Sequence, residues 1–293
     1  MITRRNFLST ALGGAAASVA LHDAFASGRP AWTKPIGLEL YTVRDMMAKD
    51  PAKTLKDVAA AGYTEVEITG FLPSQASAAA MKKNLSEAKL TAPSGYYGMP
   101  KTADDWKKSA EAAHSLGLKY MVTGNTDEMG ADGWKKLAAL FNECGKISAA
   151  AGAQFCYHNH IREFENHGNT TGYQILLAEC DPKLVKMEMD IFWIYYSNEE
   201  PLHFWKEHPG RFPLLHIKDI KKGVAGSTTK FPDEKGPNPF AAVGKGKIDW
   251  AKIFAHVREA GAEHIFVEQD RCDVPELESI KESYEYLRKL KVD

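Results

Sequence analysis

Four side chains that could bind a metal ion recur at equivalent places along the chain: His158, Asp190, His216 and Glu268. Each lies at the end of a short apolar run that predicts a β-strand. A mixed set of imidazole and carboxylate donors suits Zn²⁺, Mn²⁺, Fe²⁺ or Co²⁺ better than Ca²⁺. Taken singly, a strand histidine is more often a hydrogen-bonded structural residue, and a strand-end aspartate often begins the next helix. Their repetition in four successive strands predicts one divalent metal ion bound by all four.

Short apolar runs alternate with amphipathic stretches along the chain, which predicts strands separated by helices. The predicted strands are residues 36–41, 64–68, 91–96, 119–124, 153–159, 185–190, 212–217 and 264–268. The predicted helices are residues 103–116, 131–151, 172–180, 202–208 and 250–260, and one that begins at Asp50-Pro51 and ends at Gly62. Eight strands joined by helical crossovers imply a parallel sheet that closes into a (β/α)₈ barrel.

The barrel gives the four candidate ligands a common position, because reacting groups in this fold lie at the C-terminal ends of the strands. A doubly wound open sheet is the alternative, but it requires a glycine-rich phosphate loop after the first strand. Residues 41–45, Tyr-Thr-Val-Arg-Asp, form no such loop. We therefore predict a single α/β domain with the TIM-barrel fold over residues 27–293.

The N-terminus has the features of a twin-arginine signal peptide over residues 1–26. Arg4-Arg5 precede an apolar stretch at residues 8–20, and Ala24-Phe25-Ala26 fits the small-x-small cleavage rule. A membrane anchor is the alternative, but the stretch is shorter than the roughly 20 residues that span a bilayer. We expect a periplasmic protein that meets the twin-arginine translocase during export and keeps no stable membrane anchor. That route carries folded proteins, which suits a chain that acquires its metal first.

Composition limits the remaining possibilities. Removing 26 residues from 293 leaves 267, near the roughly 250 residues of a typical barrel. Lys and Arg number 37 against 38 Asp and Glu, so no basic excess points to nucleic acid. The spacing of the four cysteines matches no zinc motif. We expect free, buried thiols at Cys144, Cys156, Cys180 and Cys272.

Five segments resemble the sugar phosphate isomerase/epimerase family, the xylose-isomerase-like barrels. They are residues 37–45, 157–160, 187–193, 216–219 and 243–246, in order along the mature chain. The resemblance implies that strands five to eight supply Glu, Asp, His and Glu to one metal.

One of the four implied ligands departs from the family pattern. Asp190, His216 and Glu268 match the last three, whereas His158 stands where the family generally has glutamate. An epimerase that works with two bases needs a carboxylate on each face of its substrate, so His158 disfavours that symmetric mechanism. Glu163 or Glu165, in the following loop, could supply the missing carboxylate.

Several residues near the predicted ligands are candidates for catalysis. Glu268 is the candidate general base. Lys218, two residues after His216 and on the same side of the strand, could stabilise developing negative charge. His160, two residues after His158, could donate a proton or support the metal site. Glu188, one layer below Asp190, is expected either to form a hydrogen bond inside the barrel or to brace a ligand.

Substrate contacts are predicted from aromatic and acidic side chains near the strand ends. Trp193 and Tyr97 could stack on sugar rings, and Glu39 could bind sugar hydroxyls. Packing under the loops and structural hydrogen bonding are the competing explanations for these side chains.

The expected reaction is sugar isomerisation or epimerisation, in which the metal stabilises the enediolate formed by removing a proton beside a carbonyl. The alternative is a lyase or dehydratase that expels a β-substituent from a 3-keto-sugar or its glycoside. A barrel that only binds sugar is the third possibility. Export and the lack of an anion loop argue against a phosphorylated substrate. Charge balance and export argue against a DNA-repair endonuclease.

Overall fold

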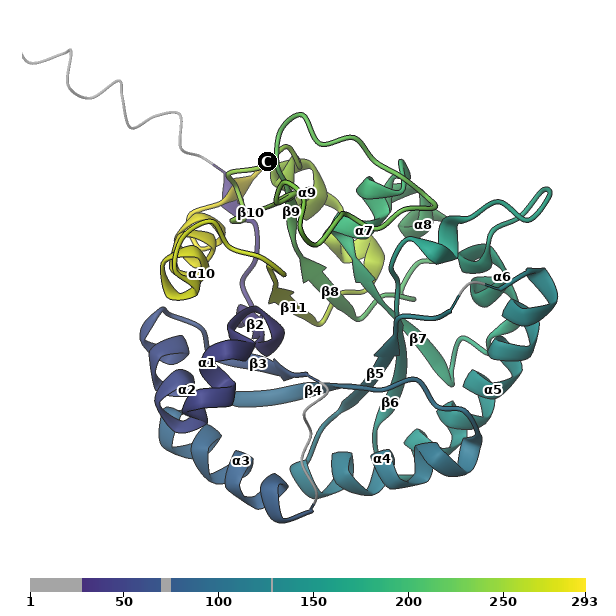
Figure 1. Cartoon of the computed structure of the whole chain (residues 1–293), viewed down its shortest axis with the longest axis horizontal. Coiled ribbons are helices and arrows are strands. Elements are labelled where there is room, and N and C mark those ends of the chain that lie inside the picture. Colours follow the sequence, from purple (N-terminus) through teal and green to yellow (C-terminus); the bar gives the residue numbers. More distant parts are fainter. Residues whose placement is uncertain (1–27, 70–74, 128) are drawn as a thin grey trace, which may run out of the picture.

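Eight parallel strands form a closed barrel with helices around its outside (Figure 1). The computed structural model describes residues 28–69, 75–127 and 129–293, so the predicted signal peptide lies outside the described residues. The barrel strands are β2 (Gly37–Glu39), β3 (Glu65–Ile68), β4 (Thr91–Tyr97), β5 (Tyr120–Gly124), β6 (Gln154–His158), β7 (Val185–Asp190), β8 (Leu214–Ile217) and β11 (His264–Val267). β11 pairs with β2 and β8. The predicted single TIM barrel is confirmed.

The helices that follow the strands form the outer layer. They are α1 (Arg44–Lys49), α2 (Pro51–Ala60), α3 (Gln75–Ala88), α4 (Ala103–Leu116), α5 (Ala131–Ala150), α6 (Gly172–Glu179), α7 (Ile191–Tyr196), α8 (Pro201–Glu207), α9 (Trp250–Ala260) and α10 (Glu276–Leu287). Among the residues that the structure covers, no helix has the length and apolar character needed to cross a bilayer.

Local sequence signals set several of these helix ends. Asp50 caps α2 by accepting the Lys53 backbone N–H, and Pro51 occupies the first turn. Gly117 and Gly261 end α4 and α9 in the left-handed conformation that glycine adopts without strain. These three boundaries were predicted from the sequence. No helix was predicted over the residues of α1, α3, α7 or α10.

The first barrel strand is shorter than predicted. It ends at Glu39, and a 3₁₀ turn over Leu40–Val43 follows. The Glu39 carboxylate accepts the backbone N–H of Tyr41 at 3.2 Å and so begins this turn. The early end places Glu39 at the strand terminus and turns Tyr41 toward the surface.

Short antiparallel pairs complete the sheet structure. β1 (Arg29–Pro30) pairs with β12 (Lys291–Val292), and β9 (Asp219–Ile220) pairs with β10 (Phe240–Ala241). The first pair ties the start of the described chain to its end. The second lies directly after β8 and organises the loop that follows it.

Asp219, in β9, holds that loop together. Its buried carboxylate accepts five hydrogen bonds, from the backbone N–H groups of Ile220 (2.8 Å), Gly244 (2.9 Å), Gly246 (3.2 Å) and Ile248 (3.2 Å) and from Trp250 Nε1 (2.9 Å). The carboxylate thus accepts the backbone N–H groups of an irregular segment, which has no strand hydrogen bonds to satisfy them. It fixes the chain immediately after Lys218.

We expect Asp219→Ala to lower the free energy of unfolding by at least about 3 kcal/mol, because it leaves several buried donors without an acceptor. Urea unfolding followed by circular dichroism measures this change. Asp132→Ala, at an exposed position in the first turn of α5, is the matched control and should cost less than about 1 kcal/mol. Equal losses in the two variants would contradict the role of Asp219.

Candidate metal centre and active site

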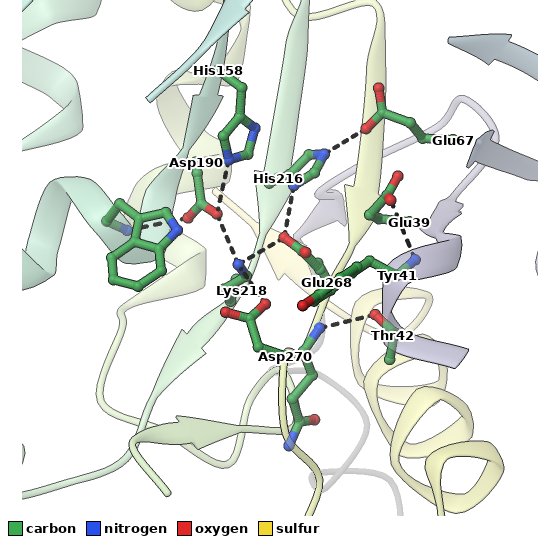
Figure 2. Close-up of polar contacts among 12 residues, drawn as sticks. Glu39, Tyr41, Thr42, Glu67, His158, Asp190, His216, Lys218, Glu268 and Asp270 are labelled. Atoms are coloured by element: carbon green, nitrogen blue, oxygen red, sulfur yellow. Dashed lines mark hydrogen bonds and ion pairs between the residues drawn. The ribbon is translucent and has the colours of Figure 1, made fainter. Parts of the chain in front are cut away.

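A pocket of about 750 Å³ opens at the C-terminal ends of the barrel strands. His158, His216 and Glu268 line it, and all three side chains are buried. Asp190, at the end of β7, lies opposite His216 in the strand register. Figure 2 shows these side chains converging from neighbouring strands. The structure therefore brings the four predicted ligands together.

His158 has a carboxylate at each of its ring nitrogens. Nδ1 lies 2.9 Å from Glu188 Oε2, and Nε2 lies 3.6 Å from Asp190 Oδ2. Burial, followed by the nearby charge of His216, holds the pKa of His158 well below its usual value. A neutral imidazole whose Nδ1 is fixed by a carboxylate presents the lone pair of Nε2, the arrangement seen around metal-binding histidines.

Asp190 divides its carboxylate between two roles. Oδ1 accepts the Trp193 N–H at 3.1 Å and begins α7. Oδ2 faces His158 and lies 3.2 Å from Lys218 Nζ. Asn159 fixes the backbone of Asp190 through two hydrogen bonds of 3.1 and 3.3 Å. The helix-cap and metal-site explanations of this aspartate are therefore compatible.

His216 bridges two carboxylates. Its Nδ1 lies 2.9 Å from Glu268 Oε2, and its Nε2 lies 2.6 Å from Glu67 Oε2. Burial opposes a charge here, but the carboxylates of Glu188 and Glu268 outweigh it and raise the pKa of His216 well above its usual value. With no metal bound, His216 therefore holds both ring protons, and a metal would have to displace one of them in order to bind.

Lys218 is the second buried cation, with 2% of its surface exposed. Its Nζ lies 2.7 Å from Glu268, 2.9 Å from Asp270 and 3.2 Å from Asp190. Burial would lower the pKa of Lys218, but these carboxylates raise it well above the usual value. The ammonium also lies 5.4 Å from the centre of the Trp193 ring, a cation–π contact.

Negative charge exceeds positive charge around these two cations. The carboxylates are those of Glu39, Glu67, Glu188, Asp190, Glu268 and Asp270. Burial, with Glu67 next in importance, raises the pKa of Glu188 to about 8. Burial also raises the pKa of Asp270 to about 6, against the effect of Lys218. Such a group of buried carboxylates is stabilised by protons or by a further cation.

The geometry fits a divalent ion at His158, Asp190 and His216. One donor atom from each of these residues lies within 4.8 Å of the others. Within the described ranges, the only ion pair of Asp190 Oδ2 with a lysine or arginine is the one with Lys218 at 3.2 Å. Ligand atoms about 2.0–2.2 Å from a metal lie roughly 3–4 Å apart, close to the 3.6 Å between His158 Nε2 and Asp190 Oδ2. Glu268 lies beside this group, where Lys218 and His216 hold it.

A second possible ligand group consists of Glu39, Glu67 and His216, all buried. It shares His216 with the first group and lies toward β2 and β3. The Ser94 hydroxyl donates a hydrogen bond to Glu67 Oε1 at 2.5 Å, so one oxygen of the Glu67 carboxylate already has a partner. Burial, and then the charge of Glu67, raise the pKa of Glu39 well above its usual value.

His160 lies in the pocket, as expected. Its ring centre is 4.8 Å from that of His158, and its Nδ1 has no hydrogen-bond partner in the part of the chain that the structure describes. Burial, followed by the charge of Lys218, lowers the pKa of His160 to about 3. His160 is therefore a neutral imidazole with a free nitrogen.

Glu163 does not take the place of the missing ligand glutamate. Its carboxylate accepts the Tyr157 hydroxyl at 2.5 Å and the His160 backbone N–H at 3.0 Å. Neither Glu163 nor Glu165 lines the pocket of the described chain. Glu163 instead fixes the loop that carries His160.

Two of the three predicted substrate residues, Trp193 and Glu39, line the pocket. Tyr97 does not: its ring packs against Trp106, with centres 5.7 Å apart, between the barrel and α4. Tyr96 lines the pocket instead. Successive side chains of a strand point to opposite faces, so the assignment was wrong by one residue.

Asn159 and Asp270 are functional candidates that the sequence interpretation missed. Asp270 follows Glu268 by two residues, the same spacing by which Lys218 follows His216. This repeated spacing could have identified Asp270. Asn159, directly after β6, forms hydrogen bonds with the backbone of Asp190 at the end of the neighbouring strand β7. The residues around Asn159 in the sequence do not indicate that contact.

We expect His158→Ala to weaken the binding of Mn²⁺ and Zn²⁺ by at least about 100-fold, since loss of an orienting neighbour alone costs about 10–100-fold. Isothermal titration calorimetry on metal-depleted protein measures the affinity. His203→Ala, which removes an exposed histidine paired with Glu207, is the matched control and should bind like the wild type. Unchanged affinity in His158→Ala would rule out His158 as a ligand.

Comparison with known proteins agrees with this architecture. An inosose dehydratase of Geobacillus thermodenitrificans is 26% identical over 266 residues, covering 80% of this chain and 87% of that protein. A sugar phosphate isomerase/epimerase structure from Parabacteroides distasonis superposes with a TM-score of 0.72 at 24% identity, covering 89% of this chain and 96% of the other.

A xylose isomerase-like TIM barrel protein from Mycobacterium smegmatis, solved in complex with magnesium, superposes with a TM-score of 0.66 at 15% identity, covering 89% of this chain and 97% of the other. The family model described as xylose isomerase-like TIM barrel matches residues 55–290. The chain belongs to the xylose isomerase-like TIM barrel family.

Proposed function

We propose that the protein is a metal-dependent lyase that removes a proton beside the carbonyl of a sugar-like ketone and expels a β-substituent. The observation that carries this proposal is His158, a neutral imidazole at the position where a two-base epimerase needs a second carboxylate. The similarity to an inosose dehydratase supports elimination over isomerisation or epimerisation.

A divalent metal bound by His158, Asp190 and His216 would polarise the substrate carbonyl and favour enolisation. Glu268 is ionised: burial alone would raise its pKa, but Lys218 and His216 lower it well below the usual value. The same two contacts make Glu268 a weak base. Its role in the proposal is to hold Lys218 and His216 in position.

His160 is placed to move the proton by its position, because its ring lines the pocket. Its Nδ1 has no hydrogen-bond partner among the described residues, whereas Glu268 is held by Lys218 and His216. Negative charge that develops on the substrate raises the proton affinity of a nearby imidazole. The proton taken from the carbon can then pass from His160 to the oxygen of the leaving group, so that one residue serves both steps.

The proposal is tested with metal-loaded protein and 3-keto-glucose in D₂O, followed by NMR and mass spectrometry. We expect loss of water to an unsaturated ketone whose former C2 bears no hydrogen, so that deuterium at C2 can appear only in substrate that has not reacted. Exchange at this carbon without loss of water would contradict the lyase and support an isomerase or epimerase. Tight sugar binding with neither exchange nor loss of water would support a barrel that only binds sugar.

We expect His160→Asn to lower kcat by about 10²–10⁴-fold, the usual contribution of a general acid or base, while Mn²⁺ affinity stays within about twofold. Steady-state kinetics and calorimetry give the two quantities. His203→Asn, on the outer surface, serves as control and should keep its activity. A His160→Asn enzyme with wild-type kcat would remove His160 from the mechanism.

We also propose that residues 1–26 direct export to the periplasm by the twin-arginine route. Arg4-Arg5 and the apolar stretch after them support this. With both arginines changed to lysine, the full-length chain should accumulate uncleaved in the cytoplasm, as cell fractionation and immunoblotting would show. Equal periplasmic amounts of both forms would contradict this route.

A further inference from the structure

The pocket is larger than one sugar ring requires. A hexose has about a dozen non-hydrogen atoms, and even at the roughly 30 Å³ that each water occupies in the liquid it would fill about 360 Å³. The pocket holds about 750 Å³. A keto-sugar at the metal ligands and His160 therefore leaves about half of the space, on the side away from the barrel floor.

The outer half of the pocket differs from the floor in chemistry. Tyr41 is 36% exposed and Phe231 is 37% exposed, and both line the pocket. Only one other large hydrophobic side chain in the described ranges, Val274, is comparably exposed. Exposed apolar groups gathered at a cavity mark a binding surface. The inner end of the pocket, at the strand ends, is made of charged groups instead.

Phe231 is fixed at the mouth. Its ring centre lies 5.5 Å from Trp193 and 6.2 Å from His160. The segment 221–239 that carries it is tied down by Arg271, whose guanidinium donates to the carbonyls of Glu234 (2.6 Å), Gly236 (3.1 Å) and Pro237 (3.2 Å). Figure 1 shows this segment, between β9 and β10, running beside α7.

Tyr41 is fixed as well. The Arg44 guanidinium lies 4.2 Å from its ring centre, donates to the Tyr41 carbonyl at 2.8 Å and donates to the Asp270 carbonyl at 2.9 Å. Aromatic groups that are already positioned lose little conformational entropy when a ligand binds against them. The mouth is thus a preformed surface for a flat ring.

We infer that the outer half of the pocket is a binding site for a second ring, so that the substrate is a glycoside whose aglycone is a sugar or aryl ring with an apolar face. This inference rests on the proposed lyase function, and it identifies the aglycone as the leaving group of that reaction. The electron pair of the C2–H bond forms the C1–C2 double bond of a 3-keto-glycoside, and the C1–O bond to the aglycone breaks. The aglycone oxygen keeps the electron pair of the C1–O bond and takes the proton that His160 removed from C2.

Kinetics on three glycosides of 3-keto-glucose test the inference: methyl, phenyl and glucosyl. We expect metal-loaded wild-type protein to prefer at least one ring aglycone to methyl by about tenfold or more in kcat/KM. Phe231→Ala should reduce that preference about tenfold, and Val274→Ala, the other exposed hydrophobic side chain, should leave it unchanged. The ring compound whose advantage over methyl falls more in Phe231→Ala identifies the aglycone class.

Equal kcat/KM for all three glycosides, or a preference that survives Phe231→Ala, would overturn the second-ring site while leaving the lyase proposal intact. Calorimetric binding of unreactive phenyl and methyl glucosides tests the site without turnover. Phenyl glucoside should bind the wild type about tenfold more tightly, and Phe231→Ala should remove the difference. Equal affinities in the wild type would overturn the inference. Lack of turnover of all three glycosides, with this binding difference retained, would contradict the lyase alone.

Discussion

Buried carboxylates at the open end of the barrel share two cations, and the positions of the site residues depend on this sharing. The Lys218 ammonium contacts three carboxylates, and His216 contacts a different carboxylate on each ring nitrogen. Glu268 belongs to both sets. A change at any one member therefore alters the charge balance of its neighbours, so the group behaves as one electrostatic unit.

Three histidines in this unit differ in charge although they are a few ångströms apart. With no metal bound, His216 is an imidazolium because carboxylates surround it. His158 and His160 are neutral because burial and the neighbouring cations disfavour a second charge. One imidazole is thereby available for a metal and another for proton transfer. The residue type alone does not assign these roles, because the neighbours determine which ring holds a proton.

Most strand ends could be predicted from the sequence, because apolar runs and helix caps are local signals. The first strand was an exception, since the Glu39 side chain begins a 3₁₀ turn there. The convergence of His158, Asp190, His216 and Glu268 followed from the symmetry of a barrel, which places all strand ends on one rim. Whether Tyr96 or Tyr97 faces the pocket depends on the strand register, because a shift of one residue moves each side chain to the opposite face of the strand. Likewise, the contact of Glu163 with Tyr157 depends on a loop conformation that no sequence period encodes.

Closure of the barrel between β2 and β11 has a consequence for how the protein is made. Glu39 comes from the first barrel strand and Glu268 from the turn after the last, so the ribosome must finish nearly the whole chain before both can lie in one pocket. Contacts between such distant segments form slowly, because a long loop must first be ordered. A nascent chain that stops before β11 exposes unpaired edges at β2 and β8 and makes a substrate for chaperones.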